Sequence, residues 1–312
     1  MERGKAKPIL VIGSLNMDLV ATATQLPKEG ETVFGQSFAT FPGGKGANQA
    51  AAAGKLGAEV YMAGCVGKDG FGEALISGLE SNGIATKFVR TVDTATGTAL
   101  ITVNGTGANT IVVVAGANGC CDAADVDRSL HAFTNPGILL LQHEIPKATV
   151  EYAIHKAKEL GWLVILNPAP MREISPALYS KIDLLTPNES EAAALAKTPI
   201  GTKQEAITAA QKLRENGIKE VVITLGEAGA VWVHAEGQED SLAYKVQAID
   251  TTAAGDSYTA AIAVALAEGK SMQAALRFAS QTAAIAVTRH GAQSSLPTRQ
   301  EVEAFAAQKK GM

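Results

Sequence analysis

Two aspartates bracket a run of small residues in the stretch DTTAAGDSYTAA. Asp250 opens this stretch, Ala253, Ala254 and Gly255 follow, and Asp256 begins a long apolar segment. Small side chains let an anion approach the free N–H groups of a helix N-terminus closely. A carboxylate there can act as a general base toward a hydroxyl, while the N–H groups hold the phosphoryl group that this hydroxyl attacks. A simpler explanation, in which Asp256 only caps the helix, stays open.

A second glycine-rich turn, FPGGKGANQAA, precedes another segment with helical periodicity. Gly43 and Gly44 permit a tight turn and let a ligand approach the backbone closely. Lys45 and Asn48 offer donors to the hydroxyls of a substrate or to a phosphate. A plain helix start rich in glycine would give the same pattern. The turn is not a Walker A loop, because no Gly-x-x-x-x-Gly-Lys-Ser/Thr occurs in the chain.

Asn16 and Asp18 stand at the end of the first predicted strand, in GSLNMDLV. Residues two apart in an extended segment point to the same face, so this amide and this carboxylate can hold neighbouring hydroxyls of a sugar. Buried polar groups of this kind reject compounds that lack the hydroxyl. An ordinary Asn/Asp turn is the alternative.

Two further turns carry polar or small residues at the end of a predicted strand. In TPNESEA, Asn188 and Glu191 have the spacing of a helix capping box. In the alternative, functional interpretation, both residues lie near phosphates and Mg²⁺. This ion keeps several waters and binds few protein carboxylates. In TLGEAGA, residues 224–230, the backbone could follow the phosphates or ribose of a nucleotide, although a hairpin turn is the simpler explanation.

Short apolar runs alternate with helical patterns along most of the chain. The runs are rich in Val, Ile and Leu, as in parallel strands that are covered on both faces. The sequence therefore predicts an α/β fold with a mostly parallel central sheet flanked by helices on both faces. The predicted strands cover residues 9–16, 60–67, 137–144, 163–170, 184–189 and 221–226, and residues 243–249 are strand-like. The predicted helices cover residues 46–56, 71–80, 148–160 and 203–215, each followed by a glycine that suits a C′ position.

Two segments, approximately residues 17–41 and 96–117, break this alternation. They contain short stretches of alternating polarity, and the second predicts a hairpin around residues 104–109. We expect the two segments to form a small β-sheet lid on one domain that spans residues 1–312. Two separate surface hairpins are the alternative.

Composition excludes several classes of protein. The 312 residues carry a formal net charge of −4, which leaves no electrostatic footprint for nucleic acid or an anionic membrane. Cys65, Cys120 and Cys121 suit neither a disulfide framework nor a zinc motif, so we expect reduced thiols and a cytoplasmic protein. The first strand begins too early for a secretory signal, and no apolar stretch reaches the ~20 residues that span a bilayer.

The motifs, taken in order, resemble those of the ribokinase-like family of carbohydrate kinases. The resemblance covers nearly the whole chain and rests most strongly on GGKGAN and DTTAAGD. It implies ATP-dependent phosphorylation of the 5-hydroxyl of D-ribose, with Asp256 as the general base. A related sugar or nucleoside kinase stays open, acting for example on fructose or a deoxyribose, as does a catalytically inactive sugar-binding regulator. The 96–117 segment has no aromatic residue to stack on a base, which disfavours nucleosides.

The resemblance also assigns roles to individual residues. Ala253, Ala254 and Gly255 would form a backbone anion hole beside Asp256. The residues implied to hold the sugar are Asn16, Asp18, Gly44, Lys45, Asn48, Glu144 and Asp256. Those implied to lie along ATP are Asn188, Thr224, Gly226, Gly229, Gly255 and Ser280, with Glu191 near Mg²⁺. Those implied to surround an activating monovalent cation, expected to be K⁺, are Asp250, Thr252, Ala286, Arg289, Gly291 and Ser295.

The resemblance further implies a homodimer that forms through the lid, and it has two departures. Residues 257–260 read Ser-Tyr-Thr-Ala, where the family often has Thr-Phe-Asn-Gly after the base. This change lies along the helix, so we expect little effect on the chemistry. Ser280 stands where a histidine is frequent near adenine, which weakens any stacking role for that residue.

Overall fold

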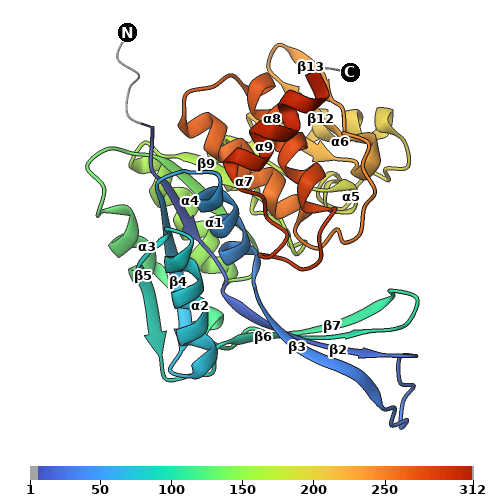
Figure 1. The fold of residues 1–312 in the computed structure, drawn as a ribbon. Coiled ribbons are helices and arrows are strands. Elements are labelled where there is room, and N and C mark those ends of the chain that lie inside the picture. The colour runs from blue at the N-terminus through green and yellow to red at the C-terminus, as the bar shows by residue number, and fades with distance from the viewer. Residues whose placement is uncertain (1–5, 311–312) are drawn as a thin grey trace.

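The computed structural model describes residues 6–310 (Figure 1). Within this range nine strands form the larger sheet, in the order β13-β12-β11-β10-β9-β8-β1-β4-β5. Pairing is parallel from β5 to β11 and antiparallel where β12 and β13 close one edge. The strands are β1 (Ile9–Ile12), β4 (Val60–Gly67), β5 (Ala85–Val92), β8 (Ile138–Leu141), β9 (Leu163–Leu166), β10 (Leu184–Leu185), β11 (Glu220–Thr224), β12 (Ala230–His234) and β13 (Gly237–Ser241).

Helices cover both faces of this sheet, which confirms the expected fold class (Figure 1). They are α1 (Lys45–Lys55), α2 (Gly70–Ser81), α3 (Ala123–Leu130), α4 (Lys147–Glu159), α5 (Glu189–Ala196), α6 (Lys203–Glu215), α7 (Ala254–Ala267), α8 (Met272–Ala286) and α9 (Arg299–Lys310). Short 3-10 helices are η1 (Gly116–Cys120), η2 (Pro176–Lys181) and η3 (Gly226–Ala228). Between residues 6 and 310, none of the helices combines the length and the apolar composition that a bilayer-spanning segment needs.

The central strand β1 shows why the apolar runs are continuous. All of its residues are buried. Ile9 and Val11 belong to a core cluster that includes residues of α1, α2, α7 and α8. Leu10 and Ile12 belong to a second cluster that includes residues of α3, α4, α5 and α6. Because neither face of the strand reaches water, successive positions are all apolar rather than alternating.

Most predicted elements are found, but several strands are shorter than predicted and one is absent. The strands predicted for residues 137–144, 163–170, 184–189 and 221–226 end at Leu141, Leu166, Leu185 and Thr224, because the chain leaves the sheet there for the loops at its carboxyl edge. The four predicted helices match α1, α2, α4 and α6 to within one residue, and a glycine with positive φ follows each of them. The strand predicted for residues 9–16 ends at Ile12, because the chain leaves the main sheet there and enters a second sheet. The strand-like assignment of residues 243–249 is wrong. This segment runs on from β13, the edge strand of the sheet, and is largely exposed, so no neighbouring strand pairs with it.

A separate four-stranded sheet, which we call the lid sheet, projects from the main body (Figure 1). Its order is β3-β2-β6-β7, formed by β2 (Asn16–Ala23), β3 (Gly35–Gly43), β6 (Gly97–Val103) and β7 (Asn109–Val114). β2 pairs with β6 in parallel, whereas the β2–β3 and β6–β7 pairs are antiparallel. The two segments therefore form one sheet rather than separate hairpins.

The base of the lid sheet lies at the carboxyl end of β1. β2 begins at Asn16, shortly after β1 ends at Ile12, and β3 ends at Gly43, just before α1 begins. Open α/β sheets bind their ligands at this edge, beside the N-termini of the helices that follow the strands. The fold thus brings the polar and glycine-rich motifs of the sequence to one place.

Candidate active site

The carboxylate of Asp256 is buried where the first turns of α1 and α7 face each other. Asp256 is the third residue of α7 and is only 4% exposed. Its Oδ2 accepts a hydrogen bond of 3.1 Å from Asn48 Nδ2, and its Oδ1 accepts one of 3.0 Å from Gln49 Nε2. The N-cap of α7 is Ala253, and no side chain caps this helix. The capping explanation for Asp256 is therefore wrong, since its carboxylate is bonded to α1.

Gln49, Gln142 and Asn167 complete this buried network, and the sequence analysis missed all three. Gln49 Nε2 also donates to Asn167 Oδ1 at 3.2 Å, and Gln49 Oε1 accepts from Gln142 Nε2 at 2.6 Å. Asn167 Nδ2 in turn donates to the carbonyl of Thr186 at 2.8 Å. A signal was present, because Gln142 and Asn167 directly follow the buried strands β8 and β9. Gln142 and Asn167, at the ends of adjacent strands, thus fix the Gln49 side chain, which in turn donates to Asp256.

The start of α7 is open to a ligand at Gly255. A Cβ built on this residue would meet no other atom within 4 Å. The first N–H groups of a helix have no partner within it and carry the positive end of the helix dipole. Of the other predicted anion-hole residues, Ala253 is buried at the N-cap, and Ala254 donates its N–H to the carbonyl of Thr251 at 3.1 Å. An anion therefore has its readiest access to this helix start at Gly255.

Lys45 lies among three carboxylates at the start of α1. The charge of Asp256 raises the pKa of the Lys45 ammonium most, burial opposes this, and Glu144 and Glu191 raise the pKa further. The Lys45 backbone N–H donates to Glu144 Oε2 at 2.9 Å, and Ser14 Oγ donates to the same oxygen at 2.5 Å. The site thus keeps a positive charge near Asp256, where it can balance a negative phosphoryl group.

Close backbone contacts explain the glycines of the GGKGAN turn. Gly44 has a φ of +87°, and a Cβ there would lie 2.7 Å from the backbone N of Asn16. A Cβ on Gly46 would lie 2.6 Å from the backbone N of Ser14. Real Cβ atoms do not approach backbone so closely, so only glycine lets α1 begin beside the end of β1. This approach places Lys45 near the base of the lid sheet.

Asn16 and Asp18 lie on β2 at the base of the lid sheet, where Asn16 pairs with Gly43. Asn118 Nδ2 donates to Asn16 Oδ1 at 2.7 Å, which orients the Asn16 amide. A Cβ on Gly43 would lie 2.3 Å from Asp18 Oδ2, so glycine is needed to leave room for this carboxylate. Burial, and then the charge of Glu144, raises the pKa of Asp18 to about 7. Two partly buried carboxylates suit a ligand that donates hydroxyl hydrogen bonds.

The capping box predicted for Asn188 and Glu191 is present at the start of α5. Asn188 Oδ1 accepts from the Glu191 N–H at 2.8 Å, and Glu191 Oε2 accepts from the Asn188 N–H at 2.9 Å. Glu191 is only 7% exposed, and burial raises its pKa, with opposing effects from the charges of Lys45 and Asp256. Glu191 therefore both caps α5 and adds negative charge to the site. A single carboxylate of this kind fits Mg²⁺, which keeps most of its waters.

The residues predicted to lie along ATP are found at the start of α5 and on β11, the β11–β12 turn, α7 and α8. Thr224, at the end of β11, forms a single β-bridge to the N-cap residue of α5. Gly226 and Gly229 have φ values of +54° and +92° in the turn between β11 and β12, which is the expected hairpin. Ser280 Oγ on α8 lies 3.0 Å from Ser241 Oγ. A hollow of about 470 Å³ adjoins Ser241, and the residues that line it are Glu239, Asp240, Ser241, Leu242, Ala243, Tyr244, Gln273, Leu276 and Arg277.

Asp250 ties the loop before α7 to the loop after α8. Its Oδ1 accepts from the N–H of Thr252 at 2.9 Å, and its Oδ2 accepts from the N–H of Gly291 at 2.9 Å. Burial acts to raise the pKa of Asp250, but the hydrogen bonds from Thr252 and Gly291 lower it overall. These three residues of the predicted cation site are therefore brought together.

Two other residues predicted for the cation site direct their side chains elsewhere. The Arg289 guanidinium bonds Glu301 on α9 at 2.6 Å, and Ser295 Oγ donates to the Ala292 carbonyl at 2.8 Å. Ala286 ends α8, and its carbonyl accepts from the Arg289 N–H at 3.1 Å. Any contribution of these positions to cation binding would come from backbone carbonyls.

The chain is similar to known sugar kinases along almost its whole length. The chain is 42% identical over 301 residues to the ribokinase of Haemophilus influenzae, covering 96% of this chain and 98% of that protein. It is 38% identical over 299 residues to a deoxyribokinase of Salmonella typhi, covering 95% of this chain and 98% of that protein. The structure of Arabidopsis thaliana ribokinase complexed with ribose and ATP matches with a TM-score of 0.89 at 36% identity, over 96% of this chain and 98% of that one.

The family match covers nearly the whole chain. Residues 6–299 match the description "pfkB family carbohydrate kinase". This range includes both helix starts that face each other at Asp256, together with the base of the lid sheet. The resemblance seen in the sequence is confirmed, and the chain belongs to the pfkB family of carbohydrate kinases.

Proposed function

We propose that the protein transfers the γ-phosphoryl group of ATP to the 5-hydroxyl of D-ribose. The observation that carries this proposal is the buried Asp256 carboxylate, held by two amide donors at the open start of α7. The similar protein of Haemophilus influenzae is a ribokinase, and the similar Arabidopsis structure contains ribose and ATP. These matches support ribose as the first candidate for the acceptor.

In this proposal the polar residues near the base of the lid sheet hold the sugar. They are Asn16, Asp18, Gly44, Lys45, Asn48 and Glu144. Asp256 accepts the proton of the 5-hydroxyl as that oxygen attacks the phosphoryl group. Asn48 and Gln49 orient the carboxylate before the sugar binds, so no reorganisation is needed at the moment of transfer. A positioned general base contributes roughly 10²–10⁴-fold to the rate.

ATP supplies the phosphoryl group, and this chain supplies positive charge around it. The N–H groups at the start of α7, from Ala253, Ala254 and Gly255, would bind the phosphoryl oxygens together with Lys45. The Ala254 N–H bonds the Thr251 carbonyl at 3.1 Å, so its use requires a small opening of this turn. Phosphoryl transfer depends mainly on such positioning and charge neutralisation.

The remaining predicted residues are assigned to the nucleotide and its metal. ATP would lie along Asn188, Thr224, Gly226, Gly229, Gly255 and Ser280, with the adenine toward the hollow beside Ser241. Ser280 offers no ring for stacking, so the apolar side chains of Leu242 and Leu276 would contact the base. Glu191 would hold Mg²⁺ through its waters, and the ion would offset charge on the phosphates.

Four other functions stay as alternatives. Deoxyribose is supported by the similarity to a deoxyribokinase, and fructose is a related sugar. A nucleoside acceptor is less strongly disfavoured than the sequence suggested, because β3 places Phe38 and Phe41 in the lid sheet, 67% and 39% exposed. An inactive sugar-binding regulator would not require Asp256, Lys45 and Glu191 to lie together.

The first prediction concerns the acceptor. A coupled assay of ADP formation with ribose, 2-deoxyribose, fructose and inosine should give the highest kcat/KM for ribose, because a site that binds a hydroxyl rejects analogues lacking it. The product of the reaction with ribose should carry its phosphate on the 5-hydroxyl. A higher kcat/KM for inosine or for 2-deoxyribose would contradict the assignment of ribose.

The control for this assay is the variant Asp256→Asn. It should lower kcat by about 10²–10⁴-fold, because the base is lost, while calorimetry still detects ribose binding. The matched variant Asp93→Asn, at an exposed position, should behave as the wild type. Turnover by Asp256→Asn close to that of the wild type would rule out Asp256 as the base.

The second prediction is a pH dependence that arises from Asp18. Its pKa of about 7 means that Asp18 takes up a proton as the pH falls through 7 and then accepts fewer hydroxyl hydrogen bonds. The kcat/KM for ribose should therefore fall over this range, because kcat/KM reports the free enzyme. Asp18→Asn should have a low kcat/KM without this inflection.

Stability of the free enzyme gives an independent test of the same group. The folded-state pKa of Asp18 is raised from 3.8 to about 7, so its contribution to stability is present at low pH and is lost as the pH rises through 7. Asp18→Asn should therefore raise Tm more at about pH 8 than at about pH 5. An equal change in Tm at both values would contradict the raised pKa.

We also propose that Asp250, Thr252, Ala286, Arg289, Gly291 and Ser295 surround a monovalent cation. The hydrogen bonds of Asp250 to Thr252 and Gly291 support this proposal, because they draw the two loops together beside the start of α7. A bound cation is a large local charge, and it would steady the loop that binds the phosphoryl group.

The third prediction tests this cation site. Activity should be higher in K⁺ than in Na⁺ or in a bulky organic cation at equal ionic strength. Asp250→Asn should reduce the activation by K⁺, since one side of the loop contact loses its charge. Equal rates of the wild type in all three salts would contradict the proposed cation site.

We further propose that residues 1–312 act as one kinase domain whose lid segments, approximately 17–41 and 96–117, pair with those of a second copy. The support is the exposed apolar surface of the lid sheet. Phe34 is 96% exposed and Phe38 is 67% exposed. Along β7, Ile111, Val112, Val113 and Val114 are all about half exposed. An apolar area of this kind is unusual on an isolated surface and typical of an interface.

The fourth prediction tests the lid dimer. Sedimentation should show a dimer for the wild type. Charging the two faces of β7 separately, by Ile111→Asp with Val113→Asp and by Val112→Asp with Val114→Asp, should give a monomer in at least one case, because a buried unpaired charge opposes association. Thr208→Asp on the exposed face of α6 is the control. A monomeric wild type, or dimers in both double variants, would contradict the proposal.

The location of the protein in the cell is a further part of the proposal. Cys65, Cys120 and Cys121 are all free thiols. Free thiols are typical of the cytoplasm, where glutathione and thioredoxin keep cysteines reduced and where ATP is available. We therefore infer a cytoplasmic location.

A further inference from the structure

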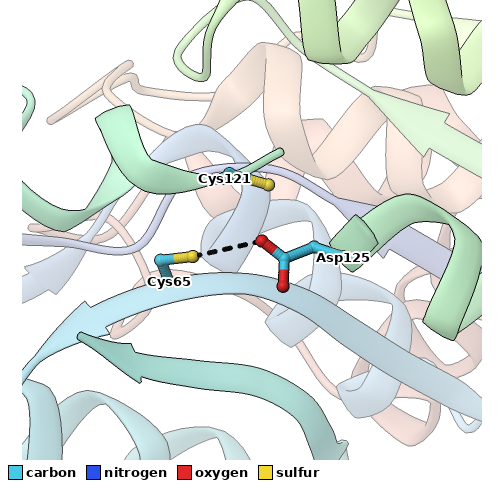
Figure 2. A group of neighbouring side chains, drawn as sticks. All are labelled: Cys65, Cys121 and Asp125. Atoms are coloured by element: carbon cyan, nitrogen blue, oxygen red, sulfur yellow. Dashed lines mark hydrogen bonds between the residues drawn. The ribbon is translucent and has the colours of Figure 1, made fainter. Parts of the chain in front are cut away.

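Cys65, Cys121 and Asp125, none of which belongs to the candidate active site, converge on one buried point (Figure 2). Cys65 lies on β4, Cys121 follows η1, and Asp125 lies in the first turn of α3. One ligand atom from each lies within 4.8 Å of the other two, and all three residues are at most 1% exposed. Cys65 Sγ donates to Asp125 Oδ2 at 3.6 Å. The wide separation along the chain explains why no zinc motif was visible in the sequence.

The charges around this cluster are already balanced. Arg90 donates to both oxygens of Asp125, at 2.9 and 2.7 Å, and Arg128 donates to Oδ1 at 2.6 Å. The two guanidinium groups are matched by Asp125 and by Asp122, whose Oδ2 lies 3.4 Å from Arg90 Nη2. Replacing two thiol protons by one divalent cation would leave the total charge unchanged. A bound ion would therefore create no unbalanced buried charge, which is the usual obstacle to such a site.

The donor set selects the class of ion. Two thiolates and one carboxylate suit a soft or borderline cation such as Zn²⁺ or Cd²⁺, whereas Mg²⁺ and Ca²⁺ prefer oxygen ligands alone. The group identified within residues 6–310 has three ligand side chains, so one position of a tetrahedral ion is left for a water molecule. Arg90 and Arg128 would act as the outer hydrogen-bond partners that commonly orient a ligating carboxylate.

We propose that Cys65, Cys121 and Asp125 form a binding site for a divalent cation of the Zn²⁺ class. On binding, two S–H bonds break, two metal–sulfur bonds and one metal–oxygen bond form, and two protons pass to the solvent. The exposed neighbour Cys120 marks the segment that must open to admit the ion. This site is separate from the one that would hold Mg²⁺, so it does not depend on the proposed kinase function.

Ion binding would tie β4 to the segment that contains Asn118 and Cys121. The Cys121 N–H donates to the carbonyl of Asn118 at 3.3 Å. Asn118 in turn orients Asn16 through its side-chain amide. The bound form should therefore be more stable than the free form, because the ion binds only where the three ligands are already assembled.

The fifth prediction is tested by titrating Cd²⁺ into the reduced, chelator-treated full-length protein. The wild type should bind one equivalent, with the ultraviolet charge-transfer absorption of a cadmium thiolate and a rise in Tm. Cys65→Ser and Cys121→Ser should lose both signals. Cys120→Ser, which removes an adjacent but exposed thiol, should keep them. Circular dichroism and sugar kinase activity establish that each variant is folded.

Proton release gives a second measurement that needs no variant. In weakly buffered solution at neutral pH, where free thiols are protonated, each Cd²⁺ bound should release two protons. Three results would overturn the proposal: the absence of charge-transfer absorption in the wild type, its persistence in both Cys65→Ser and Cys121→Ser, or the release of fewer than two protons. A disulfide between Cys65 and Cys121 in protein purified without reductant would overturn it as well.

Discussion

The contact between the Asp256 carboxylate and the amide donors of α1 is the interaction on which the site depends. A carboxylate removed from water is costly unless other donors replace the lost hydrogen bonds. Asn48 and Gln49 supply these donors, and Gln49 is itself held by Gln142 and Asn167 at the ends of β8 and β9. The position of Asp256 is therefore fixed relative to the sheet as well as to its own helix. Any shift between α1 and α7 would leave a buried charge without partners.

Before a ligand binds, the site contains more carboxylates than ammonium groups. The ammonium of Lys45 is influenced by the carboxylates of Asp256, Glu144 and Glu191, and the charge of Glu144 also acts on Asp18. Burial is the main cause of the raised pKa of Asp18 and of Glu191, and the charges of Glu144 and of Asp256, respectively, raise these pKa values further. The excess of carboxylates also suits the proposed ligands, since sugar hydroxyls donate hydrogen bonds to carboxylates and a divalent cation offsets their charge.

The sequence contained clearer signals for the local geometry of the candidate site than for the contacts between its residues. The glycines of GGKGAN and the polar pair of GSLNMDLV could be recognised, because close backbone approach and a shared strand face follow from local geometry. The partners of Asp256 could not all be recognised. Gln49, Gln142 and Asn167 are far apart in the chain and meet only when the strand order is known. The approach of Cys65 to Cys121 could not be predicted for the same reason.

Local sequence patterns were insufficient where the tertiary structure determines what a segment or side chain does. Residues 243–249 have a strand-like composition, but β13 is the last strand of the sheet, so no partner is there to pair with them. For Asp256 the local pattern left a helix cap open as an alternative, and only the donors from another helix rule it out. Asn188 and Glu191 form the capping box that their spacing predicted. Glu191 is also buried and feels the charge of Lys45, which the spacing could not predict.

The parallel pairing of β2 with β6 has a consequence for the order in which the chain assembles. These strands are separated by the whole β4–α2–β5 unit, and β2 emerges from the ribosome long before its partner. Contacts between distant segments are slow to form, because the intervening chain must first be closed into a loop. The edge of β2 that pairs with β6 therefore stays unpaired until the β4–α2–β5 unit has folded. A nascent chain halted at that stage would expose an open strand edge to its neighbours.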